Sequence, residues 1–339
     1  MNKIKLKIIY SLFVFTALLL LLNIFVDGKQ KNKIIPQKYV NRIANHNIEH
    51  KFINVLHNWS IKDEWIKKIK TRNAKSASGY IYQINLPRDV TQDFLLVDFQ
   101  NTFNGKNEEV VAEDLIKKGK TSVLIFNKNK IVVEAYFKRN FSLERKKQYI
   151  SVVVDYREGN LNTLSDDFRF VTPLTFLLRP DSKLLSLLPQ MKKHKHSMAV
   201  FLDEEIEDSN YDLLNSNDKY VLKVALSRIV KSFGRNTLYL FDKKSDFYKS
   251  INFNFIKDEL KNKYDISLIS ISAFKDLTSK DVSEIEPIIK IYLTNNKYNI
   301  FLIGENQLNE SRKLCNRLWK RGVRFLSLSK YLNRQVRSE

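Results

Sequence analysis

The chain has 339 residues, of which 43% are hydrophobic and 28% are charged, and this composition excludes a disordered chain. The formal net charge of +21 invites a nucleic-acid partner, but the lysines are scattered and form no basic block interleaved with aromatic residues. We therefore expect no nucleic acid as partner and keep a basic nucleic-acid binder only as an alternative. Cys315 is the single cysteine, which excludes an internal disulfide framework.

The N-terminal residues 1–28 have the pattern of a membrane anchor. Three lysines precede an apolar run over residues 8–26, which is long enough to cross the hydrocarbon core as a helix. No A-x-A-like cleavage site follows the run. The sequence therefore predicts an N-terminal transmembrane helix, an uncleaved signal anchor with the amino end in the cytoplasm. A cleaved signal peptide, with secretion of the rest, is the alternative.

Residues 29–75 are expected to form a tether followed by amphipathic helices. The first part is polar, and the apolar residues after it recur near helical spacing. Three histidines in this stretch have no accompanying carboxylate set of the kind that binds a metal, so we expect them to be solvated or half-packed: His46, His50 and His57.

Residues 76–140 predict a small β-α-β-β domain of the α+β class. Residues 79–86 alternate as a strand and end at Pro87, and Thr91 and Asp93 can cap a following helix. Two further strands, 121–126 and 131–137, are joined by a good hairpin turn. Nothing in this segment suggests catalysis, and packing or partner contact is its expected role.

Residues 147–335 predict a larger α/β domain. Continuous apolar runs alternate with helical segments, the pattern of a parallel sheet that is buried on both faces. Six or seven such units favour an incomplete or distorted (β/α) barrel. The runs end at polar residues, where the chemistry of such folds collects: Asp155, Arg179, Asp203, Asp242 and Glu305.

Short motifs in this domain resemble a known family. They are Val154-Asp155-Tyr156, Pro173-Leu174-Thr175-Phe176, Lys195-His196-Ser197, Phe241-Asp242, Ile303-Gly304-Glu305 and Arg321-Gly322-Val323. In order and spacing they are similar to the divergent polysaccharide deacetylase family of the chitooligosaccharide-deacetylase-like barrel superfamily. The resemblance implies a bacterial envelope protein of carbohydrate metabolism, at the inner membrane with its bulk in the periplasm.

The resemblance also implies a metal site, which this sequence matches poorly. The first-strand Asp is Asp155, but Tyr156 stands where the family has a second Asp. Phe201 and Glu305 stand where the family has histidines, and no histidine follows His196. His194 and His196 lie at the wrong end of the third strand, so we expect them to be helix-end residues favoured by the dipole rather than ligands.

The remaining candidates are carboxylates: Asp155, Asp242 and Glu305, joined by Asp203 and Glu204 if the strand ends converge. They could hold a divalent metal through oxygen ligands or act as acid and base on a glycosidic bond. We favour the interpretation that Asp155 and Asp242 are relics that accept hydrogen bonds from strand-end amides, while the others are solvated. We expect no catalytic metal or other cofactor, with a divalent metal as the alternative and Asp155 as its ligand.

These observations predict a membrane-anchored envelope protein whose deacetylase-like barrel has lost its metal site. Such a pseudoenzyme would act as a glycan-binding or protein-binding module, with cell-wall glycan or envelope proteins as partners. Residues 8–26 would attach it to the inner membrane. Whether it is an enzyme stays open. The alternative is an active hydrolase, either a polysaccharide deacetylase that removes N-acetyl groups or another carboxylate-based glycan hydrolase.

Overall fold

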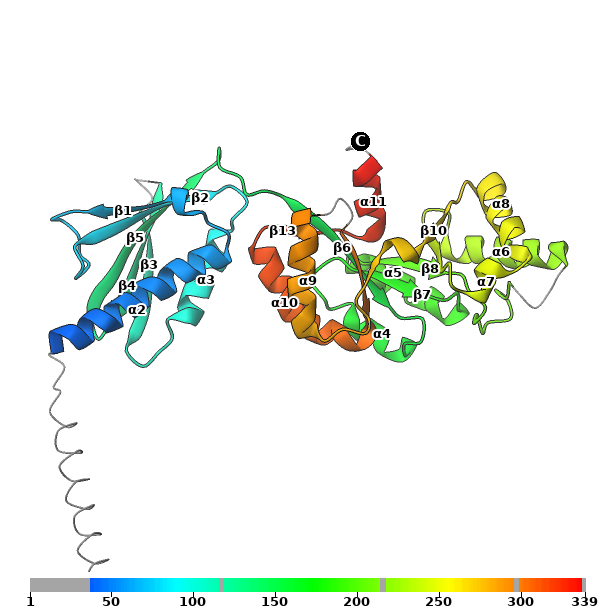
Figure 1. The fold of residues 1–339 in the computed structure, drawn as a ribbon, viewed down its shortest axis with the longest axis horizontal. Coiled ribbons are helices and arrows are strands. Elements are labelled where there is room, and N and C mark those ends of the chain that lie inside the picture. The colour runs from blue at the N-terminus through cyan, green and yellow to red at the C-terminus, as the bar shows by residue number, and fades with distance from the viewer. Residues whose placement is uncertain (1–36, 116–118, 214–217, 296–298, 337–339) are drawn as a thin grey trace, which may run out of the picture. The chain divides into compact units, whose positions relative to one another are not determined.

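The computed structural model describes residues 37–115, 119–213, 218–295 and 299–336, and this part of the chain divides into two compact units. One unit holds the described residues up to His57 together with Ile61–Leu143. The other holds Asn58–Ser60 and the described residues from Glu144 onward. Figure 1 shows the elements of both units.

The first unit is a mixed five-stranded sheet with helices on one face. Strand order is β1-β2-β5-β4-β3, with β2 and β5 parallel and the other pairs antiparallel. Phe52 and Phe99, one from each helix, stack on each other, and they pack on Tyr82 and Phe137 of the sheet. The elements are α2 (Gln37–Asn58), β1 (Ile66–Lys70), β2 (Tyr80–Pro87), α3 (Gln92–Thr102), β3 (Glu108–Leu115), β4 (Lys120–Asn127) and β5 (Lys130–Asn140).

Two strands of this unit differ from the sequence prediction. β1 lies where the apolar spacing indicated a helix, and β3 was not predicted at all. Both are edge strands with mostly exposed side chains, so neither has the alternation of a half-buried strand. Their conformation depends on pairing with β2 and β4, which the local sequence does not show.

The second unit is a parallel α/β half-barrel. Seven strands follow the order β10-β9-β8-β7-β6-β12-β11, and β13 pairs with the start of β6. β10 and β11 do not pair, so the barrel is open there, as the prediction of an incomplete barrel allowed. The strands are β6 (Gln148–Asp155), β7 (Thr175–Leu178), β8 (Ser197–Phe201), β9 (Leu238–Phe241), β10 (Leu268–Ser270), β11 (Lys275–Asp276), β12 (Ile300–Gly304) and β13 (Val323–Phe325).

Helices join these strands: α4 (Leu161–Asp167), α5 (Leu188–Lys193), α6 (Lys219–Phe233), α7 (Asp246–Lys249), α8 (Asn252–Tyr264), α9 (Val282–Asn295), α10 (Leu308–Lys320) and α11 (Leu328–Val336).

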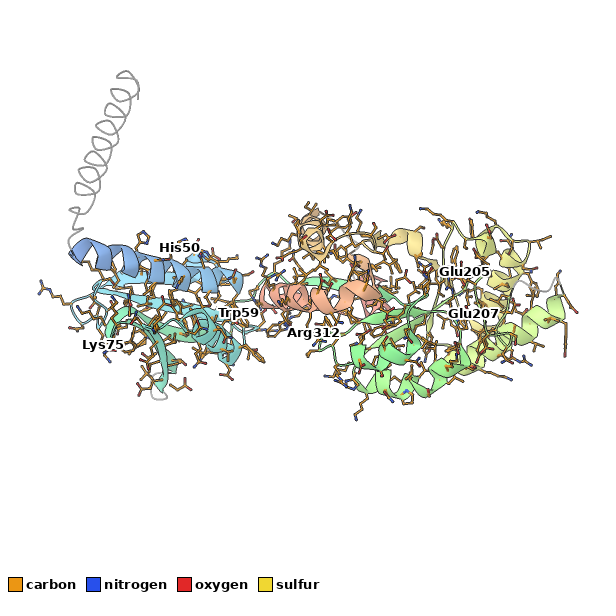
Figure 2. The ribbon with its side chains drawn as sticks, turned by 90° about the horizontal axis from the view of Figure 1, so that it is seen from below. His50, Trp59, Lys75, Glu205, Glu207 and Arg312 are labelled. Carbon is orange, nitrogen blue, oxygen red and sulfur yellow. The ribbon has the colours of Figure 1, made fainter. Side chains whose placement is uncertain are left out.

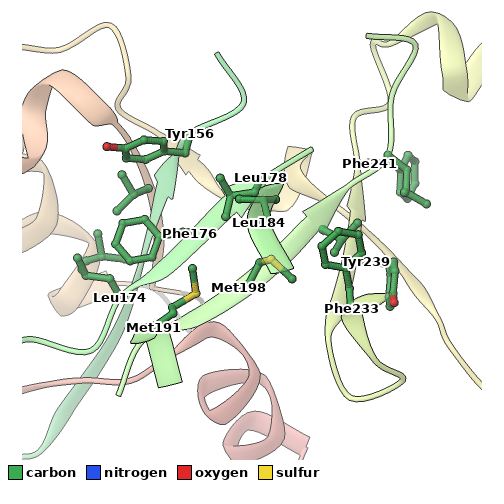
Figure 3. Close-up of a cluster of buried hydrophobic side chains, with 14 of the residues drawn as sticks. Tyr156, Leu174, Phe176, Leu178, Leu184, Met191, Met198, Phe233, Tyr239 and Phe241 are labelled. Atoms are coloured by element: carbon green, nitrogen blue, oxygen red, sulfur yellow. The ribbon is translucent and has the colours of Figure 1, made fainter. Parts of the chain in front are cut away.

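Both faces of the half-barrel sheet are buried, which explains the continuous apolar runs. Val152 and Val154 of β6 belong to a large cluster with residues of α6, α8, α9 and α10. Figure 3 shows part of this cluster around Phe176 and Met198. Val153 points to the opposite face, where Leu328 and Tyr331 of α11 cover the sheet.

The predicted membrane anchor, residues 8–26, lies outside the described residues. Within the described ranges, no helix combines the length and the apolar character needed to cross a membrane.

Candidate functional site

The carboxyl ends of the parallel strands bring the polar residues to one edge of the sheet. Asp155 is the last residue of β6 and lies opposite Gly304 of β12 in the strand register. Arg179 and Asp242 come directly after β7 and β9, and Asp203 is the second residue after β8. This is the edge at which parallel α/β sheets bind ligands.

Both carboxylate oxygens of Asp155 are occupied by Arg157. The guanidinium donates from Nε to Oδ1 at 2.9 Å and from Nη2 to Oδ2 at 2.7 Å. The backbone N–H of Arg157 also donates to Oδ1, at 3.2 Å, which fixes the turn after β6. The two side chains are only 24% and 16% exposed, so this two-pronged pair is shielded from water.

Arg157 lies between acidic strand ends and an aromatic ring. Its guanidinium carbon is 4.5 Å from the centre of the Phe201 ring at the end of β8, a cation–π distance. Burial alone would lower the pKa of Arg157, but the Asp155 carboxylate outweighs burial, and Asp203 and Asp242 raise the pKa further. One cation therefore interacts with carboxylates from three strand ends.

A second arginine continues this network across β7 and β8. Arg179 donates from Nε to Asp203 Oδ2 at 2.8 Å and from Nη1 to the carbonyl of Arg157 at 2.8 Å, and its Nη2 donates to Glu205. Asp203 is 95% buried. Burial raises its pKa, although the hydrogen bond and the charge of Arg179 act to lower it. The ends of β6, β7 and β8 are thus tied together by side-chain bonds.

Glu305 lies on the other side of Asp155, against the turn after β6. A Cβ added at Gly159 would overlap both the ring of Tyr156 and the carboxylate of Glu305, so only glycine permits this approach. Thr163 donates to Glu305 at 3.4 Å. Tyr156 donates to Asp167 at 2.6 Å, and burial together with that carboxylate raises its pKa.

The two remaining carboxylates accept hydrogen bonds from backbone amides. Asp242 accepts from the N–H of Lys244 at 2.9 Å in the turn after β9. Glu204 accepts from the N–H groups of Asp246 and Phe247, both at 3.1 Å, and so caps α7. These bonds to backbone amides lower the pKa of Glu204 although burial opposes them.

The donors at this edge do not fit a metal ion. Asp155 is held at both oxygens by a guanidinium, and Phe201 has no lone pair to offer where the resemblance implies a histidine. Across the described ranges, no group of three or more His, Cys, Asp or Glu side chains is arranged to hold a metal ion. Asp155 and Asp242 both raise the pKa of Arg157. Glu305 lies apart from them and accepts a hydrogen bond from Thr163.

The histidines do not belong to this edge. His194 is exposed and caps the end of α5, as expected. His196 is the third residue after the end of α5, and its side chain is buried. Its Nδ1 accepts from the N–H of Leu174 at 3.2 Å and its Nε2 donates to the carbonyl of Phe168 at 3.0 Å. In the first unit, His57 pairs with Asp63 at the surface.

A polar pocket of about 470 Å³ opens beside the arginine network. Its walls come from the segments that follow β6, β7 and β8, and include Arg157, Arg179 and Asn162. Glu205 and Glu207, from the segment after β8, also line it. Both side chains are labelled in Figure 2. The volume is in the range of pockets that bind small ligands or single units of a polymer.

Sequence reasoning placed Arg179 at a strand end but gave it no role in a site, and it did not single out Arg157. One signal was present: β7 ends at a cation and β8 ends at three carboxylates, and neighbouring strand ends of opposite charge predict an ion pair. The Asp155–Arg157 pair had no comparable signal, because two residues so close in sequence meet only if the turn between them folds back.

No family model matches the chain, and no curated protein matches it as a sequence relative. Solved structures do match. BA3943 of Bacillus anthracis, described as a CE4 family pseudoenzyme, is 10% identical with a TM-score of 0.37, over 70% of this chain and 94% of its own. A mutant of the peptidoglycan deacetylase PdaC of Bacillus subtilis is 14% identical with a TM-score of 0.35, over 58% of this chain and 95% of its own.

The uncharacterized protein ATU2773 of Agrobacterium tumefaciens C58 is 13% identical with a TM-score of 0.37, over 56% of this chain and 91% of its own. The protein is therefore structurally similar to CE4 polysaccharide deacetylases and to a CE4 pseudoenzyme. At these identities the likeness concerns the path of the chain and not the side chains at the strand ends.

Proposed function

We propose that the half-barrel is a non-catalytic binding module of the bacterial cell envelope, in which the guanidinium of Arg157 takes the place of a metal ion. The observation that carries this proposal is the position of Arg157. It binds both oxygens of Asp155, and the carboxylates of Asp203 and Asp242, which follow β8 and β9, raise its pKa.

A metal ion and this guanidinium would compete for the same oxygens. The guanidinium stays protonated at any physiological pH, so it cannot release Asp155 by losing its charge. Displacing it would leave a shielded cation without its partner, which is costly. Phe201 also favours the guanidinium over a metal ion at this position, because the face of its ring stabilises the guanidinium and has no atom that could bind a metal.

The ligand of the module is proposed to be a cell-wall glycan or another envelope protein, bound at the polar pocket beside Arg179. The pocket is lined by amide, carboxylate and guanidinium groups, which match the hydroxyl groups of a sugar. Residues 8–26 would anchor the module in the inner membrane, and the described units would then lie in the periplasm.

Metal content tests the first part of this proposal. The purified full-length chain is dialysed against trace divalent ions and measured by elemental mass spectrometry, beside Asp155→Ala. We expect no stoichiometric metal in either protein. About one equivalent in the wild type that is lost in Asp155→Ala, together with deacetylation of acetylated glycans, would overturn the proposal in favour of an active deacetylase.

Glycan binding tests the second part. Asn162 lines the pocket with an exposed side chain, so Asn162→Ala should weaken co-sedimentation with cell-wall glycan several-fold without unfolding the protein. Asn309→Ala, an exposed asparagine on α10 outside the pocket, is the matched control and should bind as the wild type does. Equal binding by both variants would exclude this pocket as the glycan site.

A further inference from the structure

The sheet of the first unit ends in two edge strands of opposite charge. Among the residues that the structure describes, β1 and β3 are the outermost strands, and each pairs with one neighbour only. Most of their side chains are exposed. The β1 edge carries Lys67, Lys68 and Lys70, and the β3 edge carries Glu108, Glu109, Glu113 and Asp114.

The direction of these strands permits a continuous sheet between copies. β1 is antiparallel to β2, β2 is parallel to β5, β5 is antiparallel to β4, and β4 is antiparallel to β3. β1 and β3 therefore run in opposite directions within one copy. If a second copy is placed beside the first in the same orientation, β3 of one and β1 of the other meet as an antiparallel pair, the slightly more stable kind.

The side chains on the two edges also match in register. Lys67 and Ile69 share the sheet face away from Tyr82 and the helices, because Lys68 is the residue that pairs with Tyr82. Val111 and Glu113 lie on that same face, because the register of β3 places its even-numbered residues beside the buried side chains of β4.

One antiparallel register then joins complementary residues. It places Lys67 opposite Glu113 and Ile69 opposite Val111. Ile69 is 38% exposed and Val111 is 40% exposed, and both are among the large apolar side chains left at the surface. Lys67 and Glu113 have no ion-pair or hydrogen-bond partner among the residues that the structure describes.

We propose that the protein self-associates through these edges, with β3 of one copy pairing antiparallel to β1 of the next in this register. Such a contact is heterologous, because each copy keeps one free edge of each kind, and it adds further copies in a row. The proposal is independent of the function proposed for the half-barrel, since it uses residues of the first unit only.

Charged edges often serve to keep copies apart, and that is the competing explanation. Protection of this kind works when both edges carry the same sign, because like charges that lie opposite each other are repulsive. Here the signs are opposite, so the edges repel copies of themselves and attract each other. The test must therefore separate attraction between the edges from simple protection of each.

Charge reversal makes this separation. The full-length chain in detergent is studied by sedimentation velocity at low ionic strength, where exposed charges act most strongly. K67E and E113K each place like charges opposite each other. The dissociation constant for self-association of either variant alone should therefore be about tenfold higher than that of the wild type. A mixture of K67E with E113K restores opposite charges at every contact, and association should return. Lys138→Glu, an exposed reversal on the central strand β5, is the control.

Recovery in the mixture, with loss in each single variant and none in Lys138→Glu, supports the proposal. A wild-type chain whose mass does not depend on concentration at low salt overturns it. So does association of K67E or E113K alone that equals the wild type, or a mixture that associates no better than its components.

Discussion

At the scale of single residues, His196 shows how burial changes the part a side chain plays. Both ring nitrogens bond to backbone groups, one to the N–H of Leu174 and one to the carbonyl of Phe168. The ring also packs against Phe168 and Phe176. Burial lowers its pKa, because a charged imidazolium is poorly solvated there, although the bond to Phe168 opposes this.

This lowered pKa predicts a loss of stability in mild acid. Below pH ~6.5 the unfolded chain takes up a proton at His196 before the folded chain does, so the free energy of unfolding falls as the pH drops toward the lowered folded pKa. We expect the wild type to lose more stability between pH ~7 and ~5 than His196→Gln, measured by urea denaturation at each pH. His50→Gln, at an exposed residue of the first unit, should follow the wild type. Identical profiles for the wild type and His196→Gln would show that this ring does not titrate on unfolding.

At the candidate site, Arg157 shows how a contact that depends on a turn decides what a neighbouring carboxylate can bind. Asp155 was predicted to stand at a strand end, and it does. The sequence could not show that a residue two positions later would bind both of its oxygens, because that contact depends on the turn. A carboxylate at this position could bind a metal ion or an arginine. Which of the two it binds depends on the residues around it and not on its own position at the strand end.

At the scale of elements, buried strands were predictable and edge strands were not. β6, β8, β9 and β12 are apolar on both faces, so their runs stand out from the flanking helices. β1 has lysine at three of five positions and gives no such signal. The apolar run at β7 predicts a strand from Val171 to Leu178, but only Thr175–Leu178 pairs, and Val171 is 94% exposed.

One glutamine joins two elements at the open side of the half-barrel. The two N–H groups on Nε2 of the buried Gln307, just after β12, are shared among the carbonyls of Leu277, Thr278 and Lys280. Its Oε1 accepts from the N–H of Gly304 at 2.7 Å. This side chain therefore holds the segment between β11 and α9 against the end of β12.

Gln307→Glu should destabilise the half-barrel by about 3 kcal/mol. The carboxylate cannot donate, so three carbonyls lose their donor and face a buried negative charge instead. Urea denaturation followed by circular dichroism measures the loss. Gln190→Glu, the same change at an exposed position of α5, should stay within about 0.5 kcal/mol of the wild type. If both variants lose the same amount, the Gln307 bonds contribute nothing to stability.

At the scale of the whole molecule, charge is distributed differently from what the net value of +21 suggests. The β3 edge in one unit and the ends of β6, β8 and β9 in the other gather carboxylates, while lysines spread over the rest. The sequence could place the buried strands and their polar ends, but of the charge pairs between strand ends only Arg179 with Asp203 had a sequence signal. Pairing of this kind depends on which strand ends become neighbours, and neighbours are set by the fold rather than by the order of residues.

The membrane anchor is the last prediction, and it concerns the chain as a whole. A helix over residues 8–26 rises about 1.5 Å per residue, which brings its length close to the ~30 Å thickness of the hydrocarbon core. We expect the full-length protein to stay with the membrane fraction after alkaline extraction, and a variant that lacks residues 1–28 to move to the soluble fraction. Mass spectrometry of the membrane-bound protein should find the N-terminal residues still attached. A soluble product shortened at its N-terminus would establish cleavage and secretion instead, and full-length protein in the soluble fraction would show that the run does not insert.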